Sequence, residues 1–339
     1  MDAIRGKQLL VTGGCGSIGS QITKRALNEG ADTVRVLDND EAALFKLQQE
    51  IDDTSRLRTL LGDIRDRDRL RFALEGIDIV FHAAALKHVE LNEYNPFESV
   101  RTNVQGTQNL IRAALEEEVE SFVGISTDKA SNPTSVMGAT KLLSERLVIA
   151  ANWYKGHRNT QFSCVRFGNV IGSSGSVIPL FYRQIMAGGP VTVTDPEMTR
   201  FIMPINEAVD LVFSANEQMN GGEVFVFKMP TFEVGTLAET MIDAYSPESP
   251  DDIEIDIIGP RPGERKHEKL LSEDELKNTV EKPNMFVIYP DIDLSDCDRQ
   301  DETVSLTNEY TSEKDKPLPP KELLDMIEQT DTIAKGVNQ

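Results

Sequence analysis

The sequence contains few residues of the kinds that bind metal ions or form disulfide bonds. It has three cysteines and four histidines among 339 residues. The cysteines share no metal-binding spacing, and an odd, sparse number of them argues against a disulfide framework. No two histidines lie at helical spacing. We therefore expect no metal site and no structural disulfides.

The sequence also lacks a long apolar segment and an excess of positive charge. No apolar run approaches the roughly 20 residues that span a bilayer, and the first residues do not resemble a signal peptide. The net charge of −21 opposes binding to nucleic acids and to anionic membranes. We expect a soluble, cytoplasmic protein. Its acidity fits a well-solvated surface or, as we favour, a cytoplasm of high salt in which screening removes self-repulsion.

The first half of the sequence alternates short apolar runs with helical patterns. In segments such as 99–118, apolar residues recur at three- and four-residue spacing, which is typical of helices. The apolar runs predict strands at 7–12, 33–38, 58–63, 78–84, 121–126 and 161–168. Because these strands are apolar on both faces, the sequence predicts an α/β fold of the Rossmann type, with a doubly wound parallel sheet covered by helices on both sides.

We expect the chain to divide into three parts. Residues 1–170 are predicted to form the dinucleotide-binding domain. Pro and Gly become frequent after it, and 171–290 are predicted to form a smaller substrate-binding lobe, interleaved with the end of the sheet. In the final part, 291–339, nine acidic residues and little apolar periodicity at 291–316 predict a solvated loop or flexible stretch. A short helix is predicted at 319–329, with prolines at its start.

A glycine-rich segment follows the first predicted strand and opens the first predicted helix. Gly13, Gly16 and Gly19 have the small side chains needed where the backbone turns tightly and approaches a pyrophosphate at the helix N-terminus. A glycine triplet also marks any tight strand–helix turn. Here, however, Asp38 ends the second predicted strand, where its carboxylate can bind ribose hydroxyls and would repel a 2′-phosphate. The sequence predicts a dinucleotide site that favours NAD over NADP.

Further contacts with the dinucleotide are predicted where the first, third and fourth strands end. Small residues beside the cofactor are expected after the fourth strand, and an adenine ring would lie after the third. A plain strand–helix turn would also account for each of these positions. In addition to the three glycines and Asp38, the candidate cofactor-binding residues are Ser17, Ile18, Asp63, Ile64, Ala83 and Ala84.

Several segments spread over nearly the whole chain are similar to those of one enzyme family. They are TGGCGSIG (12–19), HAAALKHVELNEYNP (82–96), TNVQGTQN (102–109), STDKASNPTSVMGATK (126–141), VRFGNVIGSSGSVIPLF (165–181), TDPEMTRFIM (194–203) and GPRPGERKHEKLL (259–271). They resemble the extended short-chain dehydrogenase/reductase family and, within it, the UDP-N-acetylglucosamine 4,6-dehydratases of polysaccharide biosynthesis. The LKHV and STDKA blocks are the most specific, since generic epimerases of the family usually lack both.

The resemblance implies an internal redox elimination on a UDP-sugar, with NAD kept bound. Hydride leaves sugar C4, water is lost across C5 and C6, and the hydride returns to C6. The resemblance also implies a homo-oligomer packed through helices of the main domain. Two alternatives stay open, a nucleotide-sugar 4-epimerase and a non-catalytic NAD-binding scaffold. The first would need no elimination acid, and the second predicts losses among the candidate catalytic residues.

Those catalytic residues follow the fifth predicted strand, at the edge of the sheet where ligands bind. By resemblance, Asp128 is the acid at C6, Lys129 is the base at C5 and Thr127 hydrogen-bonds the C4 oxygen. Lys141 is expected to hold the nicotinamide ribose and to stabilise an alkoxide at C4. We expect burial to raise the pKa of Asp128 and lower that of Lys129, although their mutual attraction opposes both shifts. A helix-capping turn would also account for STDK.

Met137 occupies a position at which sites of this kind usually carry a tyrosine, four residues before Lys141. Methionine neither accepts nor donates a proton, so the C4 proton is expected to leave through Thr127 or a water towards Asp128. Among similar proteins, small soluble dehydratases that invert C5 carry tyrosine, whereas larger membrane-anchored ones that retain C5 carry methionine. The methionine favours retention, although the chain has the size of the inverting group. Met137 is expected to pack against sugar or nicotinamide, and a plain core position is the alternative.

The rest of the substrate site is also predicted largely from the resemblance. Asn169, Arg200 and Arg261 are expected to contact the diphosphate, and Glu268 the uridine ribose. Both arginines could instead form ion pairs in a chain so rich in acids. The candidate substrate-binding residues are Lys87, Asn103, Asn169, Arg200, Arg261 and Glu268, whereas His88 fits a helix-packing role equally well.

Overall fold

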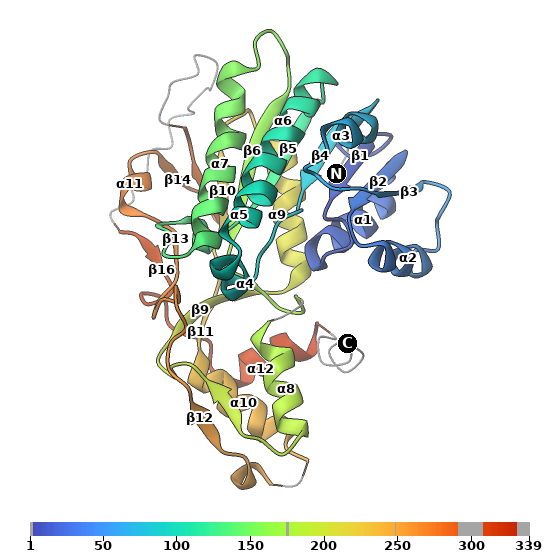
Figure 1. Ribbon diagram of the computed structural model, residues 1–339. Coiled ribbons are helices and arrows are strands. Elements are labelled where there is room, and N and C mark those ends of the chain that lie inside the picture. Colours follow the sequence, from blue (N-terminus) through green and yellow to red (C-terminus); the bar gives the residue numbers. More distant parts are fainter. Residues whose placement is uncertain (1–2, 174–175, 248, 291–307, 331–339) are drawn as a thin grey trace.

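The computed structural model describes residues 3–173, 176–247, 249–290 and 308–330. Its larger part is built around a nine-stranded sheet (Figure 1). From one edge to the other, the strands are β14 (Thr279–Glu281), β15 (Met285–Ile288), β10 (Val224–Phe227), β6 (Gln161–Phe167), β5 (Ser121–Thr127), β4 (Ile79–His82), β1 (Gln8–Thr12), β2 (Thr33–Asp38) and β3 (Leu57–Leu61). β15 is antiparallel to β10 and β14, and the other neighbours are parallel. The predicted strands are present with ends shifted by a residue or two, which confirms the predicted fold.

Helices pack in two groups around this sheet (Figure 1). α1 (Ser17–Asn28) packs against α9 (Ile205–Gln218). α6 (Thr107–Glu116) lies between α3 (Arg67–Leu74) and α7 (Val136–Tyr154) and contacts both. The predicted pattern of strands alternating with covering helices is therefore observed.

Short polar side chains define where several of these helices begin. Asp40 accepts a hydrogen bond from the Ala43 amide at the start of α2 (Glu41–Glu50). The Asp66 side chain accepts hydrogen bonds from two amides in the first turn of α3. Both contacts satisfy backbone donors that a helix leaves unpaired at its N-terminus.

The helix predicted at 99–118 has an irregular beginning. α4 (Val89–Tyr94) and α5 (Pro96–Ser99) lead into a π-helical segment, Val100–Gly106, and only then does α6 begin. Wide π-helical turns are rare and often occur near functional sites. This one carries Asn103, whose side chain holds the loop that follows β4.

The order of the strands creates a crevice at one point of the sheet. The chain passes from β1 outward through β2 and β3, then returns to build β4 on the opposite side of β1. Ligands of open α/β sheets bind at such a point, beyond the carboxyl ends of the strands. A Cβ atom on Gly13, whose φ is +63°, would lie 2.6 Å from the Ala84 backbone, and one on Gly19 would lie 2.2 Å from the Gly13 carbonyl oxygen. Glycine is therefore required where these loops meet.

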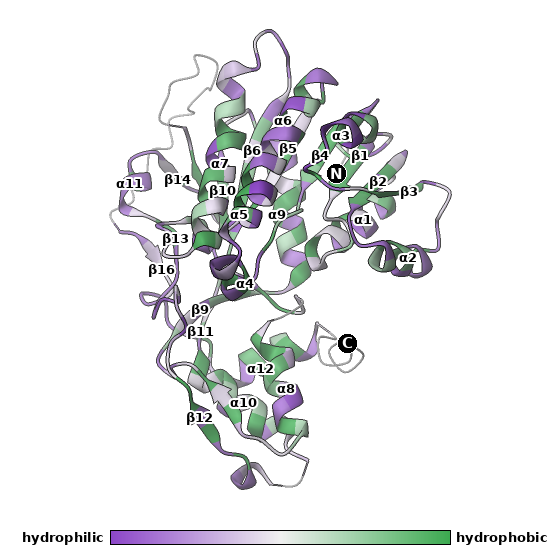
Figure 2. Cartoon of the chain, in the orientation of Figure 1, coloured by the Kyte–Doolittle hydropathy of each residue, from purple (hydrophilic) through white to green (hydrophobic). Residues whose placement is uncertain are grey.

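A smaller lobe with its own apolar core lies below the sheet in Figure 1. It contains α8 (Val177–Met186), α10 (Val234–Tyr245) and α12 (Pro320–Glu328), together with β8 (Val191–Val193) paired with β12 (Ile255–Ile257). The facing sides of its helices are apolar (Figure 2). Its buried core includes Phe181, Leu237, Met241, Leu323 and Ile327. The predicted C-terminal helix is present as α12, and the domain boundary at residue 170 stays a prediction.

Short strands connect the lobe to the sheet. β9 (Thr199–Met203) lies between β7 (Asn169–Val170) and β11 (Thr231–Glu233), and β13 (Lys269–Leu271) pairs with β16 (Tyr310–Thr311). β16 falls within the segment predicted to be a solvated or flexible acidic loop, of which 291–307 lie outside the described residues. At its described end that prediction is wrong, because the Tyr310 ring packs against Phe201 and Phe286 and Ser312 is fully buried.

A buried group of charges fixes one of these returning segments to the sheet. Arg166 of β6 is completely buried and forms ion pairs with Glu145 of α7, and with Glu275 of α11 (Glu273–Leu276) at 2.8 Å. It also donates a hydrogen bond to the Leu270 carbonyl of β13. This ion triad joins a strand, a long helix and the C-terminal segment at one point.

Arg166→Met should therefore destabilise the protein strongly, because it leaves two buried carboxylates without a cation. We expect the free energy of unfolding to fall by about 3 to 5 kcal/mol, measured by urea denaturation. Lys7→Met is the control, since its pair with Glu120 lies on the surface and should contribute less than about 1 kcal/mol. Equal losses in the two variants would contradict the importance of the buried triad.

Candidate active site

A cavity of about 1380 Å³ extends from the glycine-rich loop after β1 to the smaller lobe. All candidate site residues predicted from the sequence line it, with the exception of Asn103. His88, which sequence reasoning left aside, lines it as well. The structure thus brings the predicted cofactor, catalytic and substrate residues into one continuous space.

The dinucleotide end of the cavity lies at the N-terminus of α1. Gly16 precedes the helix and provides no side-chain cap, and the N-terminus of a helix is a place where backbone N–H groups can bind an anion. The Asp38 carboxylate accepts hydrogen bonds from the Cys15 amide at 3.0 Å and the Asp40 amide at 3.2 Å, which hold it at the cavity wall. These residues fit a dinucleotide with a free ribose 2′-hydroxyl.

Asp63, at the predicted adenine position, is paired with a neighbouring arginine. Burial acts to raise the pKa of Asp63, but hydrogen bonds from Arg65 outweigh it and keep this pKa below its usual range. Ile64 beside it is buried against Gly106 at the start of α6. The adenine position is thus bordered by one apolar side chain and one ion pair.

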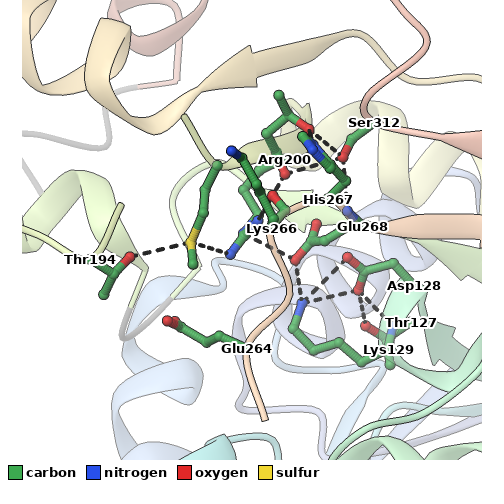
Figure 3. A network of polar contacts seen from close by, with 12 residues as sticks. Thr127, Asp128, Lys129, Thr194, Arg200, Glu264, Lys266, His267, Glu268 and Ser312 are labelled. Carbon is green, nitrogen blue, oxygen red and sulfur yellow. Dashed lines mark hydrogen bonds and ion pairs between the residues drawn. The ribbon is translucent and has the colours of Figure 1, made fainter. Parts of the chain in front are cut away.

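The catalytic end is built by the turn that follows β5 (Figure 3). The Thr127 hydroxyl donates a hydrogen bond to Asp128 Oδ1 at 2.7 Å, and the Lys129 amide donates to the same oxygen at 2.9 Å. Lys129 Nζ then lies 3.1 Å from this oxygen and 3.1 Å from Oε1 of Glu268. The predicted acid and base are adjacent, and a second carboxyl group joins them.

Glu268 comes from the opposite side of the cavity, immediately before β13. Its Oε1 lies 3.4 Å from Arg200 Nε, and its backbone amide donates to Ser312 Oγ at 2.8 Å. Its other oxygen, Oε2, is buried without a hydrogen-bond partner among the described residues. The carboxyl group predicted to contact a uridine ribose therefore lies at the catalytic pair, with one oxygen committed to Lys129.

The pKa shifts of the pair are opposite to those predicted. Burial favours the neutral forms of both groups, but the attraction between them is stronger. It lowers the pKa of Asp128 to about 2, and together with Glu268 it raises the pKa of Lys129 above its usual value. Burial and the nearby charge of Asp128 raise the pKa of Glu268 to about 8. The group poised to hold a proton near neutral pH is thus Glu268 and not Asp128.

Lys141 and Met137 extend into the cavity from α7. Lys141 Nζ donates a hydrogen bond to the Ile125 carbonyl at 2.5 Å, and burial lowers its pKa. Met137 is 4% exposed and lines the cavity. This wall therefore offers one fixed cation and one apolar surface.

Asn103 does not reach the cavity, which corrects its predicted contact with substrate. Only 1% of the residue is exposed. Its side chain accepts a hydrogen bond from the Leu86 amide at 2.8 Å and donates to the Leu86 carbonyl and to Thr140 Oγ1, both at 3.0 Å. Its function is to fix the loop after β4, which carries Lys87.

The two predicted phosphate-binding arginines both form ion pairs in this structure, as their alternative interpretation anticipated. Arg200 pairs with Glu268 and also donates to the Thr199 and Lys266 carbonyls. Arg261 lies 3.3 Å from Glu90, which is on the other side of the cavity. Both still line the cavity, so diphosphate contact by either one, or by Asn169, stays a prediction.

The residues that support this site from outside the cavity were not among the predicted site residues. Ser126 donates to Glu145, which belongs to the buried triad, and Ser312 bonds to Thr199. One feature of the sequence could have indicated the triad, because Arg166 is the one charged residue in the predicted strand at 161–168 and a buried arginine needs anionic partners. No local pattern pointed to Ser312, which is distant in sequence from both of its partners.

Residues 9–290 match the family model described as "Polysaccharide biosynthesis protein". The chain belongs to this family. A UDP-N-acetylglucosamine 4,6-dehydratase (inverting) of Campylobacter jejuni (strain 81-176) is 39% identical over 339 residues, covering 96% of this chain and 98% of that protein. An uncharacterized membrane protein of Methanocaldococcus jannaschii is 58% identical over 287 residues, covering 84% and 86%. Within the described part of this polysaccharide biosynthesis protein, no helix combines the length and apolarity needed to cross a membrane.

Two solved structures have the same fold as this family member. Pen from Bacillus thuringiensis superposes with a TM-score of 0.91 at 41% identity, covering 97% of this chain and 99% of that one. The dTDP-glucose 4,6-dehydratase of Streptomyces venezuelae, solved with NAD bound, gives 0.68 at 26% identity, covering 76% and 86%. The predicted family resemblance and Rossmann-type fold are confirmed.

The raised pKa of Glu268 should make stability depend on pH in a defined direction. Between its ordinary pKa of 4.5 and about 8, the folded protein holds a proton that the unfolded chain has released, so the free energy of unfolding falls as pH rises. Glu268→Gln should flatten this decline by roughly 1 to 3 kcal/mol over the window. Urea denaturation at several pH values measures it, and an unchanged slope would disprove the shift.

Proposed function

We propose that the protein is an NAD-dependent UDP-N-acetylglucosamine 4,6-dehydratase that produces a UDP-4-keto-6-deoxy sugar for glycan synthesis. The observation that carries the proposal is the group formed by Thr127, Asp128, Lys129 and Glu268, in the same cavity as an uncapped helix N-terminus. A reductase or 4-epimerase needs no acid for elimination, whereas dehydration needs both an acid and a base. The dehydratases among the relatives support the same reaction.

Bound NAD would supply the hydride acceptor for C4 and the hydride returned to C6. Gly13, Gly16 and Gly19 would let the backbone approach its pyrophosphate, and Asp38 would hold its adenosine ribose. Lys141 would orient the nicotinamide ribose. We further propose a homo-oligomer that acts in the cytoplasm, with NAD preferred over NADP.

The ionised state of Asp128 is the one that the first step requires. Through Thr127, which already donates to Asp128, the carboxylate can take the proton of the C4 hydroxyl. Now protonated, Asp128 can give this proton to the C6 oxygen as it leaves as water. Lys129, as a neutral amine, would take the C5 proton and later return it. Protons balance, because the one lost from C4 departs in the water.

Met137 supports retention of configuration at C5. The side chain cannot transfer a proton, so a single base, Lys129, removes and returns the C5 proton on one face of the ring. Arg200, Arg261 and Asn169 would hold the diphosphate. In this proposal, substrate binding replaces the ion pairs of both arginines.

Incubation with UDP-N-acetylglucosamine and NAD should yield a product with a C6 methyl signal in its NMR spectrum, with C5 configuration retained. Asp128→Asn and Lys129→Met should fold and bind NAD yet lose at least about 100-fold in turnover, since each removes an acid–base group. A C4 epimer as product would instead identify an epimerase, and no conversion would favour a scaffold.

Asp38→Asn should weaken NAD binding by about 10- to 100-fold, because it replaces charge-assisted hydrogen bonds to the ribose hydroxyls. The same change should reduce discrimination against NADP, since it removes the repulsion of a 2′-phosphate. Calorimetric titration with each dinucleotide measures both effects. Unchanged affinity for both would show that Asp38 does not bind the ribose.

A further inference from the structure

Glu268 is a buried carboxyl group that has no role in the reaction as proposed above. Its side chain is 9% exposed, and Oε1 lies 3.1 Å from Lys129 Nζ, which also contacts Asp128 (Figure 3). Glu268 lines the cavity, and its Oε2 is buried without a hydrogen-bond partner among the described residues. Burying a carboxyl group in this way costs free energy unless its oxygens are hydrogen-bonded or paired with a cation.

Lys129 can act as a base only if a neighbouring group first accepts a proton from it. An ammonium ion cannot act as a base, and two carboxyl groups stabilise the charged form of this lysine. Asp128 cannot accept the proton of Lys129, because in the proposed reaction Asp128 takes the C4 proton through Thr127. Among the described residues, Glu268 is the other carboxyl group in contact with Nζ.

Resting on the proposed dehydration, we infer that Glu268 takes the proton of Lys129 before C5–H is broken and returns it at the end of the cycle. An N–H bond of Lys129 breaks and an O–H bond forms on Glu268, which neutralises both groups. The amine then takes the C5 proton, the electron pair of that bond forms C5=C6, and the C6 oxygen leaves with the proton held by Asp128. No external oxidant or reductant is needed.

The surroundings of Glu268 determine when it can accept a proton. The charged groups that face it are Asp128 and Lys129 from the turn after β5 and Arg200 from β9. Its chain neighbours His267 and Lys269 are bonded to Thr199 and Glu309, and Ser312 is uncharged. Below about pH 8 Glu268 already holds a proton, so turnover should rise with pH and level off above this value.

Glu268→Gln tests the inference, because glutamine can still accept a hydrogen bond from Lys129 but cannot accept its proton. We expect kcat to fall about 100-fold or more, with the rise in kcat near pH 8 lost or moved upward by at least one unit. Deuterium incorporation at C5 from D₂O should fall in parallel. The affinity for UDP, measured by calorimetry, should not fall, because the change removes the competing partner of Arg200 and no proposed diphosphate contact. Glu268→Asp should restore part of kcat.

Glu309→Gln is the matched control. It removes a carboxylate that pairs with Lys269, the residue next to Glu268, but Glu309 itself does not line the cavity. It should keep the wild-type pH profile. Wild-type kcat in Glu268→Gln, or a loss confined to KM and UDP affinity, would overturn the inference and leave the dehydratase standing. If the wild-type protein itself forms no 4-keto-6-deoxy product, both the inference and the proposed function fail.

Discussion

The ammonium group of Lys129 lies between two buried carboxyl groups from distant parts of the chain, and the site is arranged around this contact. Asp128 precedes it in sequence, whereas Glu268 follows 139 positions later. Lys129 compensates the buried charge of Asp128, and Glu268 beside them can be buried because it holds a proton near neutral pH. The same contact links the sheet to the segment that returns from the smaller lobe. The candidate proton-transfer groups therefore meet only when the two parts of the chain are packed together.

Such a contact needs a rigid support, because acid–base groups are effective only within hydrogen-bond distance of one another. The support comes from outside the cavity. Arg166 ties α7 and α11 to β6, and its hydrogen bond to the Leu270 carbonyl fixes β13, which follows Glu268 directly. On the other side, Ser312 is bonded to both Thr199 and the Glu268 backbone. The buried charges that stabilise the fold thus also position Glu268 against Lys129.

The sequence predicted the parts of this protein that depend on local pattern. Strands apolar on both faces and glycines between strand and helix are dictated by neighbouring residues, so the sheet and the dinucleotide loop were predictable. The family resemblance identified Asp128, Lys129 and Glu268 as site residues. The pKa shifts of Asp128 and Lys129 were predicted in the wrong direction, since they depend on how closely the two groups approach one another and on which effect, burial or attraction, is larger. Asn103 was misassigned because nothing local distinguishes an amide that faces substrate from one that holds a loop.

The composition of the cavity walls bears on the stereochemistry that we propose at C5. At the catalytic end, the turn after β5 and the segment before β13 supply Thr127, Asp128, Lys129 and Glu268. The facing helix α7 supplies Met137, which carries no proton, and Lys141, whose ammonium group is bonded to a backbone carbonyl. Inversion at C5 would require a proton donor on the face opposite the base. A tyrosine at position 137 would place a hydroxyl on α7, whereas methionine provides none, and this supports our proposal that the C5 proton leaves and returns through Lys129.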